Sequence, residues 1–290
     1  MRSAGEFGYR ARAQIKLEPP NAAYSGLNTR RIGFNRAGSR SVCDVQTCPI
    51  LLPELNSALA DLRACIGDSN EDLREIEIAA GDSAISFEPA LPNLPGGGVE
   101  RVVAGAAYKF TPSTFFQANA LLIDNLVTEA VKDLGGVTAI DLYAGAGLFA
   151  IQLAKRFEKV VAVESDRRAA EFARDNARAN GATNVEFVMA NAEAWMAGGA
   201  LRRHRAGSAA IDLVLLDPPR GGAGPVVAAL AHEAPSKVVY VSCDPVTLAR
   251  DLKGLLGARY QIEDIIAFDL FPQTYHVETI AKLARTAESK

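Results

Sequence analysis

The sequence predicts an α/β protein in which a doubly wound, mostly parallel sheet follows a small α+β module. After residue 98, short and fully apolar runs alternate with helical runs, as in parallel sheets that are buried on both faces. Before residue 98, apolar and polar residues alternate instead, which is typical of half-buried strands. The proline- and glycine-rich stretch Pro89 to Gly98 separates the two patterns. We therefore expect one domain over residues 1–98 and a second over 99–290.

The first domain is expected to begin with a hairpin. The run Tyr9 to Leu17 alternates strictly and places Arg10, Arg12 and Lys16 on its outer face. A second strand, Arg31 to Asn35, follows the turn-rich stretch 18–28 and would pair with the first. The remaining expected elements are a helix over Pro53–Cys65 and strands over Glu75–Ile78 and Ala84–Phe87.

The second domain is expected to contain a sheet of seven strands. Its candidate strands are Thr138–Leu142, Val160–Glu164, Val185–Met189, Leu213–Leu216, Val238–Ser242, Ile262–Leu270 and Val277–Leu283. Helices are expected over Ala118–Leu134, Arg167–Asn180 and Val246–Leu256. No helical run separates the last two strands, so the last strand should return antiparallel to the others.

Composition points to an ordinary globular protein, with 49% hydrophobic and 22% charged residues. No apolar run approaches the length of a membrane span, and we expect a cytoplasmic protein that acts as a monomer. Residues 1–40 carry eight basic and two acidic side chains, a charge of +6 within a chain whose net charge is −3. This asymmetry suggests contact with a polyanion, although a solvated strand face explains such a run as often.

A glycine-rich turn after the first strand of the second domain predicts a nucleotide-cofactor site. Gly145 and Gly147 let the backbone approach a ligand closely, and Glu164, about 20 residues further on, is placed to bind ribose hydroxyls. The same pattern fits a nicotinamide dehydrogenase. Asp141 favours S-adenosylmethionine, because it would attract a cationic aminoacyl group and repel a pyrophosphate.

The turn Asp217-Pro218-Pro219-Arg220 also favours a methyltransferase over a dehydrogenase. It places a stiff acidic segment at the carboxyl edge of the sheet, where ligands bind in open α/β folds. Asn191 follows the third strand and would lie near the adenine, but an N-cap of the next helix explains it equally well.

Cys243 ends another apolar strand at this edge, in the segment Val241-Ser242-Cys243-Asp244-Pro245. A free cysteine is more often a small buried hydrophobe. The strand-end position, followed by Asp-Pro, instead favours a reactive thiolate that faces the cofactor.

With these residues in place, the chain resembles the RNA uracil-5 methyltransferases, which form 5-methyluridine in ribosomal and transfer RNA. The shared motifs occur in order: Phe116-Gln117-Ala118-Asn119, Asp141 to Gly147, Asp217 to Arg220, Cys243-Asp244-Pro245 and His276-Val277-Glu278-Thr279. Residues Gly33 to Ser39 and Cys48 to Leu51 are similar to the central RNA-binding domain of the family. The resemblance is closest to the branch that acts on 23S rRNA.

The resemblance implies a Rossmann-like class I methyltransferase sheet that uses S-adenosylmethionine to methylate C5 of a uridine in RNA, ribosomal rather than transfer RNA. Cys243 would add to C6 of the base and Glu278 would remove the C5 proton. The residues implied to line the cofactor pocket are Gln117, Tyr143, Gly145, Gly147, Glu164, Asn191 and Asp217. For Gln117 the alternative is a surface residue at the start of a helix. His276 could position Glu278 or simply pack.

RNA would be gripped by the Arg10, Arg12 and Lys16 face and by the Arg30 to Arg40 cluster, with the target uridine turned out of its stack. One branch of the family holds an iron–sulfur cluster on four cysteines. Only Cys48 matches one of these, so we expect no cluster and no metal in this chain. We also expect the chain to be either a truncated product or a member of a lineage that lost the front domain.

Two other functions stay open at this point. An amino-directed nucleic-acid methyltransferase also uses an Asp-Pro-Pro motif, but usually has an aromatic residue where Arg220 stands and needs no cysteine. A non-catalytic RNA-binding remnant would not be expected to retain Cys243, Glu278 and Asp217 together.

Overall fold

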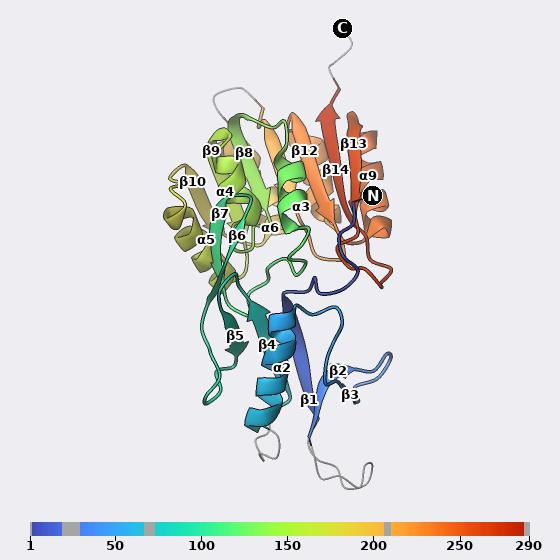
Figure 1. Ribbon diagram of the computed structural model, residues 1–290. Coiled ribbons are helices and arrows are strands. Elements are labelled where there is room, and N and C mark those ends of the chain that lie inside the picture. The colour runs from blue at the N-terminus through green and yellow to red at the C-terminus, as the bar shows by residue number, and fades with distance from the viewer. Residues whose placement is uncertain (1, 19–29, 67–72, 206–209, 287–290) are drawn as a thin grey trace. The chain divides into compact units, whose positions relative to one another are not determined.

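The computed structural model describes residues 2–18, 30–66, 73–205 and 210–286 (Figure 1). The chain forms two compact units. Unit 1 comprises Met1–Ala4, Val102–Tyr108 and Leu122–Lys290, and unit 2 comprises Gly5–Arg101 and Lys109–Leu121. Each unit is therefore built from segments that are distant in the sequence.

Unit 2 contains a five-stranded antiparallel sheet in the order β3-β2-β1-β4-β5. Its elements are β1 (Arg12–Glu18), β2 (Arg31–Asn35), β3 (Val42–Asp44), α2 (Pro53–Ile66), β4 (Glu75–Ala80) and β5 (Ile85–Glu88). The expected hairpin is confirmed, because β1 pairs with β2 antiparallel. Most of the turn-rich stretch 18–28 lies outside the described residues.

Helix α2 closes the core of unit 2. Leu55, Leu59 and Leu62 are fully buried at the spacing that places them on one face of a helix. They pack with Ile15 and Ile76 of the sheet in one hydrophobic cluster. Truncating one of these leucines to alanine should cost about 2–5 kcal/mol of folding free energy.

Unit 1 contains the predicted seven-stranded sheet, in the order β10-β9-β8-β11-β12-β14-β13. Its strands are β8 (Gly136–Leu142), β9 (Phe157–Glu164), β10 (Val185–Met189), β11 (Leu213–Leu216), β12 (Lys237–Ser242), β13 (Tyr260–Phe268) and β14 (Glu278–Arg285). The last strand, β14, is antiparallel to both of its neighbours, as expected from the sequence. The class I methyltransferase fold class is therefore confirmed.

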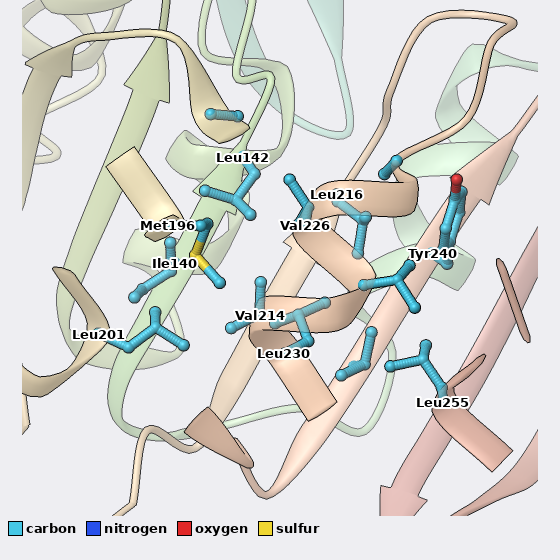
Figure 2. Close-up of a cluster of buried hydrophobic side chains, with 14 of the residues drawn as sticks. Ile140, Leu142, Met196, Leu201, Val214, Leu216, Val226, Leu230, Tyr240 and Leu255 are labelled. Carbon is cyan, nitrogen blue, oxygen red and sulfur yellow. The ribbon is translucent and has the colours of Figure 1, made fainter. Parts of the chain in front are cut away.

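Helices alternate with these strands: α3 (Ile123–Val131), α4 (Leu148–Ala154), α5 (Arg167–Ala179), α6 (Ala192–Ala197), α7 (Ala200–Arg203), α8 (Gly224–Glu233) and α9 (Pro245–Gly257). Figure 2 shows the apolar cluster between the sheet and α6 to α9, with Ile140, Leu142 and Leu216 facing Leu230 and other helix residues. Because Ile140 and Leu142 point into this cluster, Asp141 between them points to the opposite face of the sheet.

Two sequence expectations are wrong at the start of the second domain. The helix expected over Ala118–Leu134 covers only Ile123–Val131. Residues 111–122 instead form turns held by local hydrogen bonds, such as the one that the Leu121 N–H donates to Asn119 Oδ1. The hairpin of β6 (Val99–Val103) and β7 (Ala106–Phe110) was not expected. Its turn residues, Ala104 and Gly105, both have positive φ, of 46° and 72°, as a type I′ turn requires.

Candidate active site

The predicted functional residues of unit 1 gather at the carboxyl edge of its sheet. Asp141, Glu164, Asp217 and Cys243 lie at the ends of β8, β9, β11 and β12. Glu278 begins β14, which runs the other way. The register pairs Ser242 with Thr279, so Cys243 and Glu278 lie next to each other where the two strands meet this edge.

The loop between β8 and α4 has an unusual backbone. Tyr143, Gly145 and Gly147 all have positive φ, of 63°, 54° and 88°. A side chain at Gly145 would meet no atom within 4 Å, so the backbone there faces open space. Asn176 of α5 donates a hydrogen bond to the Ala146 carbonyl and fixes the loop from behind. The loop therefore leaves its backbone open at Gly145, whereas Gly147 packs against Ala173 of α5.

Glu164 is bonded to this loop. One carboxylate oxygen accepts a hydrogen bond from the Gly145 N–H at 2.8 Å, and the other accepts from the Asp166 N–H at 2.7 Å. Its side chain is half-buried. A carboxylate held by two backbone donors is fixed in position and keeps free lone pairs for hydroxyl donors.

Asp141 is fully buried, and neither of its oxygens makes a hydrogen bond of normal geometry with the described residues. Burial raises the pKa of this carboxyl well above its usual value, and the nearby Asp217 carboxylate raises it further; the Ala150 N–H lowers it, and Glu164 adds a smaller increase. A buried acid without a partner is costly for a fold. A cationic ligand group would relieve this cost, which fits the predicted role of Asp141.

Cys243 and Glu278 also titrate abnormally. Burial and the nearby Glu278 carboxyl raise the pKa of the half-buried Cys243 thiol, and only Arg220 and a backbone N–H oppose them. Burial, followed by Asp217, raises the pKa of the Glu278 carboxyl, whose side chain is 2% exposed. Both shifts favour the protonated form of the side chain, so the Cys243 thiol needs further help to form the expected thiolate.

Arg220 is a cation whose charge acts on Cys243 and lowers the pKa of this thiol. Its side chain is exposed and makes no hydrogen bond or ion pair with the part of the chain that the structure describes.

Other predicted pocket residues have structural partners. Asn191 caps α6, where its Oδ1 accepts from the Ala194 N–H at 2.9 Å, so the capping interpretation is confirmed. The Tyr143 hydroxyl donates to Glu193 at 2.8 Å and ties the glycine loop to α6. His276 packs against the rings of Tyr275 and Phe271, at centroid distances of 4.2 and 6.3 Å.

Gln117 belongs to unit 2. Its side chain is only 7% exposed, so the alternative interpretation as a surface residue at the start of a helix is wrong. Asn176 and Glu193, which hold the glycine loop, were not predicted as site residues. A buried amide on the alanine-rich face of α5 is the signal that could have identified Asn176.

The basic face of unit 2 is largely paired within the unit. Arg12 donates to the carbonyls of Pro112 and Phe116 at 2.8 and 3.3 Å. Lys16 forms an ion pair with Glu75 of β4. The alternation of buried and exposed residues along this strand is as predicted, and Arg12 and Lys16 on its outer face have partners within the unit.

The Arg30 to Arg40 cluster divides into two parts. Arg30 is buried, and Arg31 pairs with Glu18 at 3.6 Å. Arg36 and Arg40 are exposed, and their side chains make no hydrogen bond or ion pair with the described residues. These two arginines are the better candidates for contact with an anionic partner.

Among residues 2–18, 30–66, 73–205 and 210–286, no group of three or more His, Cys, Asp or Glu side chains is placed to hold a metal ion. Cys43, Cys48 and Cys65 are half-buried free thiols. No helix in the same residues is both long and apolar enough to cross a membrane.

Comparison with known proteins agrees with this geometry. Residues 101–286 match the tRNA (Uracil-5-)-methyltransferase family. The chain is 32% identical to the 23S rRNA (uracil(1939)-C(5))-methyltransferase RlmD of Enterobacter sp. (strain 638), over 96% of this chain and 71% of that protein. It is 40% identical to an uncharacterized RNA methyltransferase of Gloeobacter violaceus, over 65% of this chain and 40% of the relative.

A solved structure is similar over nearly the whole chain. It is the tRNA (uracil-54, C5)-methyltransferase of Pyrococcus abyssi in complex with S-adenosyl-L-homocysteine, with a TM-score of 0.75 and 27% sequence identity. The alignment covers 97% of this chain and 77% of that one. The similarity therefore includes unit 2 as well as the sheet of unit 1.

Proposed function

The chain belongs to the tRNA (uracil-5-)-methyltransferase family, and from this premise we propose that it transfers a methyl group from S-adenosylmethionine to C5 of a uridine in 23S rRNA. The observation that carries the proposal is the meeting of Cys243 and Glu278 at adjacent strand ends, beside the acidic pocket of Asp141 and Asp217. A thiol and a carboxyl at neighbouring positions are the pair that C5 methylation of uracil needs.

The cofactor site fits S-adenosylmethionine. Asp141, buried without a partner, would bind the cationic aminoacyl part, and Glu164 the ribose hydroxyls. The open backbone at Gly145, the close turn at Gly147 and the ring of Tyr143 would line the pocket, with Asp217 at its inner side and Asn191 near the adenine. Gln117 is carried over from the family motif. When bound, the cofactor supplies an electrophilic methyl group.

The proposed chemistry starts at Cys243, because C5 of uracil is too weak a nucleophile to take a methyl group unaided. Cys243 gives its proton to solvent and its sulfur bonds to C6 as the double bond between C5 and C6 opens, which leaves C5 as the nucleophilic carbon of an enolate. After C5 has taken the methyl group, the Glu278 carboxylate removes the C5 proton and the bond from sulfur to C6 breaks. The raised pKa of Glu278 suits a base that works near neutral pH.

The proposed RNA contacts follow from which cations are unpaired. Arg220 lies at the reacting centre, and Arg36 and Arg40 lie on unit 2. A uridine within folded RNA has to leave its stack to reach a half-buried thiol, and phosphate contacts would hold its neighbours. Ribosomal RNA is proposed over transfer RNA because the relatives that match across most of the chain act on 23S rRNA.

The test is incubation with S-adenosylmethionine and RNA that contains 5-fluorouridine. Fluorine at C5 cannot be removed as a proton, so a protein–RNA adduct that survives denaturation should accumulate, and peptide mapping should locate it at Cys243. Cys243→Ala should form no adduct, and the half-buried Cys65→Ala is the matched control. Methylation of normal RNA by Cys243→Ala would contradict the proposal and favour transfer to an exocyclic nitrogen. Intact RNA binding with no turnover by wild type would indicate a non-catalytic protein.

A further inference from the structure

Asp251 is a buried acid that the proposed reaction does not use. It lies in the second turn of α9 and is 2% exposed. Its Oδ2 accepts hydrogen bonds from the Ala223 N–H at 2.7 Å and the Tyr240 hydroxyl at 2.8 Å. Its Oδ1 accepts from Arg250 Nε at 2.9 Å. One carboxylate therefore joins α9, β12 and the loop that follows Asp217.

Two neighbours of Asp251 on the same helix hold the same loop. The Thr247 hydroxyl donates to the Arg220 carbonyl at 3.2 Å, and Arg250 Nη2 donates to the Gly221 carbonyl at 2.9 Å. Residues 247, 250 and 251 are three and four positions apart and so share one face of the helix. This face bonds to the backbone of Arg220, Gly221 and Ala223.

The loop fits closely against these side chains at Gly222. Its φ is +79°, and a side-chain carbon added there would lie 2.6 Å from Asp251 Oδ2, 3.2 Å from Thr247 Cβ and closer still to Arg250 Nη2. Such approaches are too short for any side chain. The contact between loop and helix is therefore specific in shape as well as in hydrogen bonding.

Cys243 lies between the end of β12 and the start of this helix. Cys243 directly precedes Asp244, the N-cap of α9, whose Oδ1 accepts from the Val246 and Thr247 N–H groups at 2.9 Å each. Tyr240, the second partner of Asp251, lies three residues before Cys243 on β12. Although burial raises the pKa of Asp251, hydrogen bonds from Arg250, the Ala223 N–H and Tyr240 lower it below its usual value. Asp251 is therefore a fixed anion at neutral pH.

We propose that Asp251 is a positioning residue of the active site, which locks the loop carrying Asp217 and Arg220 against β12 and α9, the strand and helix on either side of Cys243. The distance of Arg220 from the Cys243 sulfur then depends on a carboxylate that touches neither of them. The part of this inference that concerns turnover rests on the proposed function; the part that concerns the reactivity of Cys243 does not.

The test measures Cys243 alkylation by iodoacetamide against pH, read by mass spectrometry of the Cys243 peptide, together with kcat and KM for RNA methylation. Asp251→Ala should raise the apparent pKa of Cys243, slow its alkylation at pH 8 by about threefold to tenfold, and lower kcat about tenfold with a smaller change in KM. Asp251→Asn, which retains an acceptor oxygen, should restore part of the loss. Tyr240→Phe removes one bond and should act in the same direction.

Asp212→Asn is the matched control. Asp212 also accepts two N–H groups with one oxygen, from Val137 and Thr138 at 2.8 Å each, but at the opposite edge of the sheet. Asp212→Asn should lower Tm and leave the alkylation profile of Cys243 unchanged. Folded Asp251 variants with a wild-type profile, or the same shift in Asp212→Asn, would overturn the inference. If Asp251→Ala does not fold, the alkylation profiles of Asp251→Asn and Tyr240→Phe decide whether the inference holds. A shifted profile in a protein that never methylates RNA would support the positioning role and refute the proposed function.

Discussion

The carboxyl edge of unit 1 and the basic strand face of unit 2 are both rich in charge, but they use it differently. At the edge, Asp141 is buried without a partner and Arg220 is exposed without one among the described residues. On the strand face, Arg12 is bonded to two carbonyls and Lys16 to Glu75. Charges that the fold leaves uncompensated indicate ligand binding, whereas charges that it pairs stabilise the fold.

The largest effect of any substitution, a loss of turnover, is expected at Glu278. Glu278→Gln removes the proposed base and should lower kcat by about 10²–10⁴-fold. Because the pKa of this carboxyl is raised, the wild-type rate should fall as the pH is lowered through that raised value, where Glu278 becomes protonated. A rate measured from pH 5 to 9 checks this. An undiminished rate in the variant would show that another group takes the proton.

The second largest effect, a loss of cofactor affinity, is expected at Asp141. Asp141→Asn removes the proposed partner of the cationic cofactor, and the Kd for S-adenosylhomocysteine should rise about tenfold to hundredfold, as measured by calorimetry. An unchanged Kd would mean that uncompensated burial does not mark the cofactor site. Glu193→Gln, which alters an acid of α6 that is already bonded to Tyr143 of the glycine loop, is the control.

Asp141→Asn should also stabilise the protein when no ligand is added. The pKa of Asp141 is raised in the folded state, so the folded protein keeps a proton that the unfolded chain loses. The corresponding stability is complete below the unfolded pKa and is lost as the pH rises through the folded pKa. At neutral pH, Asp141→Asn should therefore gain about 1–2 kcal/mol in a urea titration, and less at acid pH. A loss of stability at neutral pH would contradict this.

On unit 2, the comparison distinguishes two exposed arginines without a partner from a lysine that is already in an ion pair. Reversing Arg36 and Arg40 to Glu should weaken RNA binding about tenfold and flatten its salt dependence, because two phosphate contacts are lost. Reversing Lys16 together with Glu75 should change affinity little, since that pair is satisfied within the unit. Equal losses in the two variants would show that pairing does not identify the binding face.

The smallest effect is expected at Tyr143. Tyr143→Phe removes its hydrogen bond to Glu193 and should cost about 1 kcal/mol, seen as a lower Tm. Cofactor affinity should fall by less than in Asp141→Asn. A larger loss of affinity than at Asp141 would place the hydroxyl of Tyr143 in direct contact with the ligand.

Much of the fold follows from local pattern. The strands Val185–Met189 and Leu213–Leu216 were predicted with their observed bounds, and the apolar run Leu213–Leu216 is buried throughout, as expected for a central parallel strand. The β6–β7 hairpin was missed, although Ala104-Gly105 between two alternating runs was a usable signal. The helix start near Ala118 was misplaced because Asn119 caps a turn before the helix, and a lone Asn does not reveal which turn it caps.

The sequence predicted which residues lie at this edge of the sheet, but not how their pKa values shift. Strand ends and family motifs pointed to Cys243 and Glu278. The raised pKa values of these two groups depend on the burial of both side chains and on Asp217, which lies elsewhere in the chain, so no local pattern could show them. In the same way, the sequence shows that Arg12 and Lys16 are basic, but only the fold shows that Pro112, Phe116 and Glu75 use these charges.

The hydrogen bond from the Gly145 N–H to Glu164 has a kinetic consequence. Together with the bonds of Asn176 and Tyr143, it holds the left-handed backbone of the glycine loop in one shape before any ligand arrives. The conformational entropy of this loop is lost during folding and is not lost again on association. Cofactor association should therefore be a single second-order step, and differences in affinity between analogues should be found mainly in how slowly they leave.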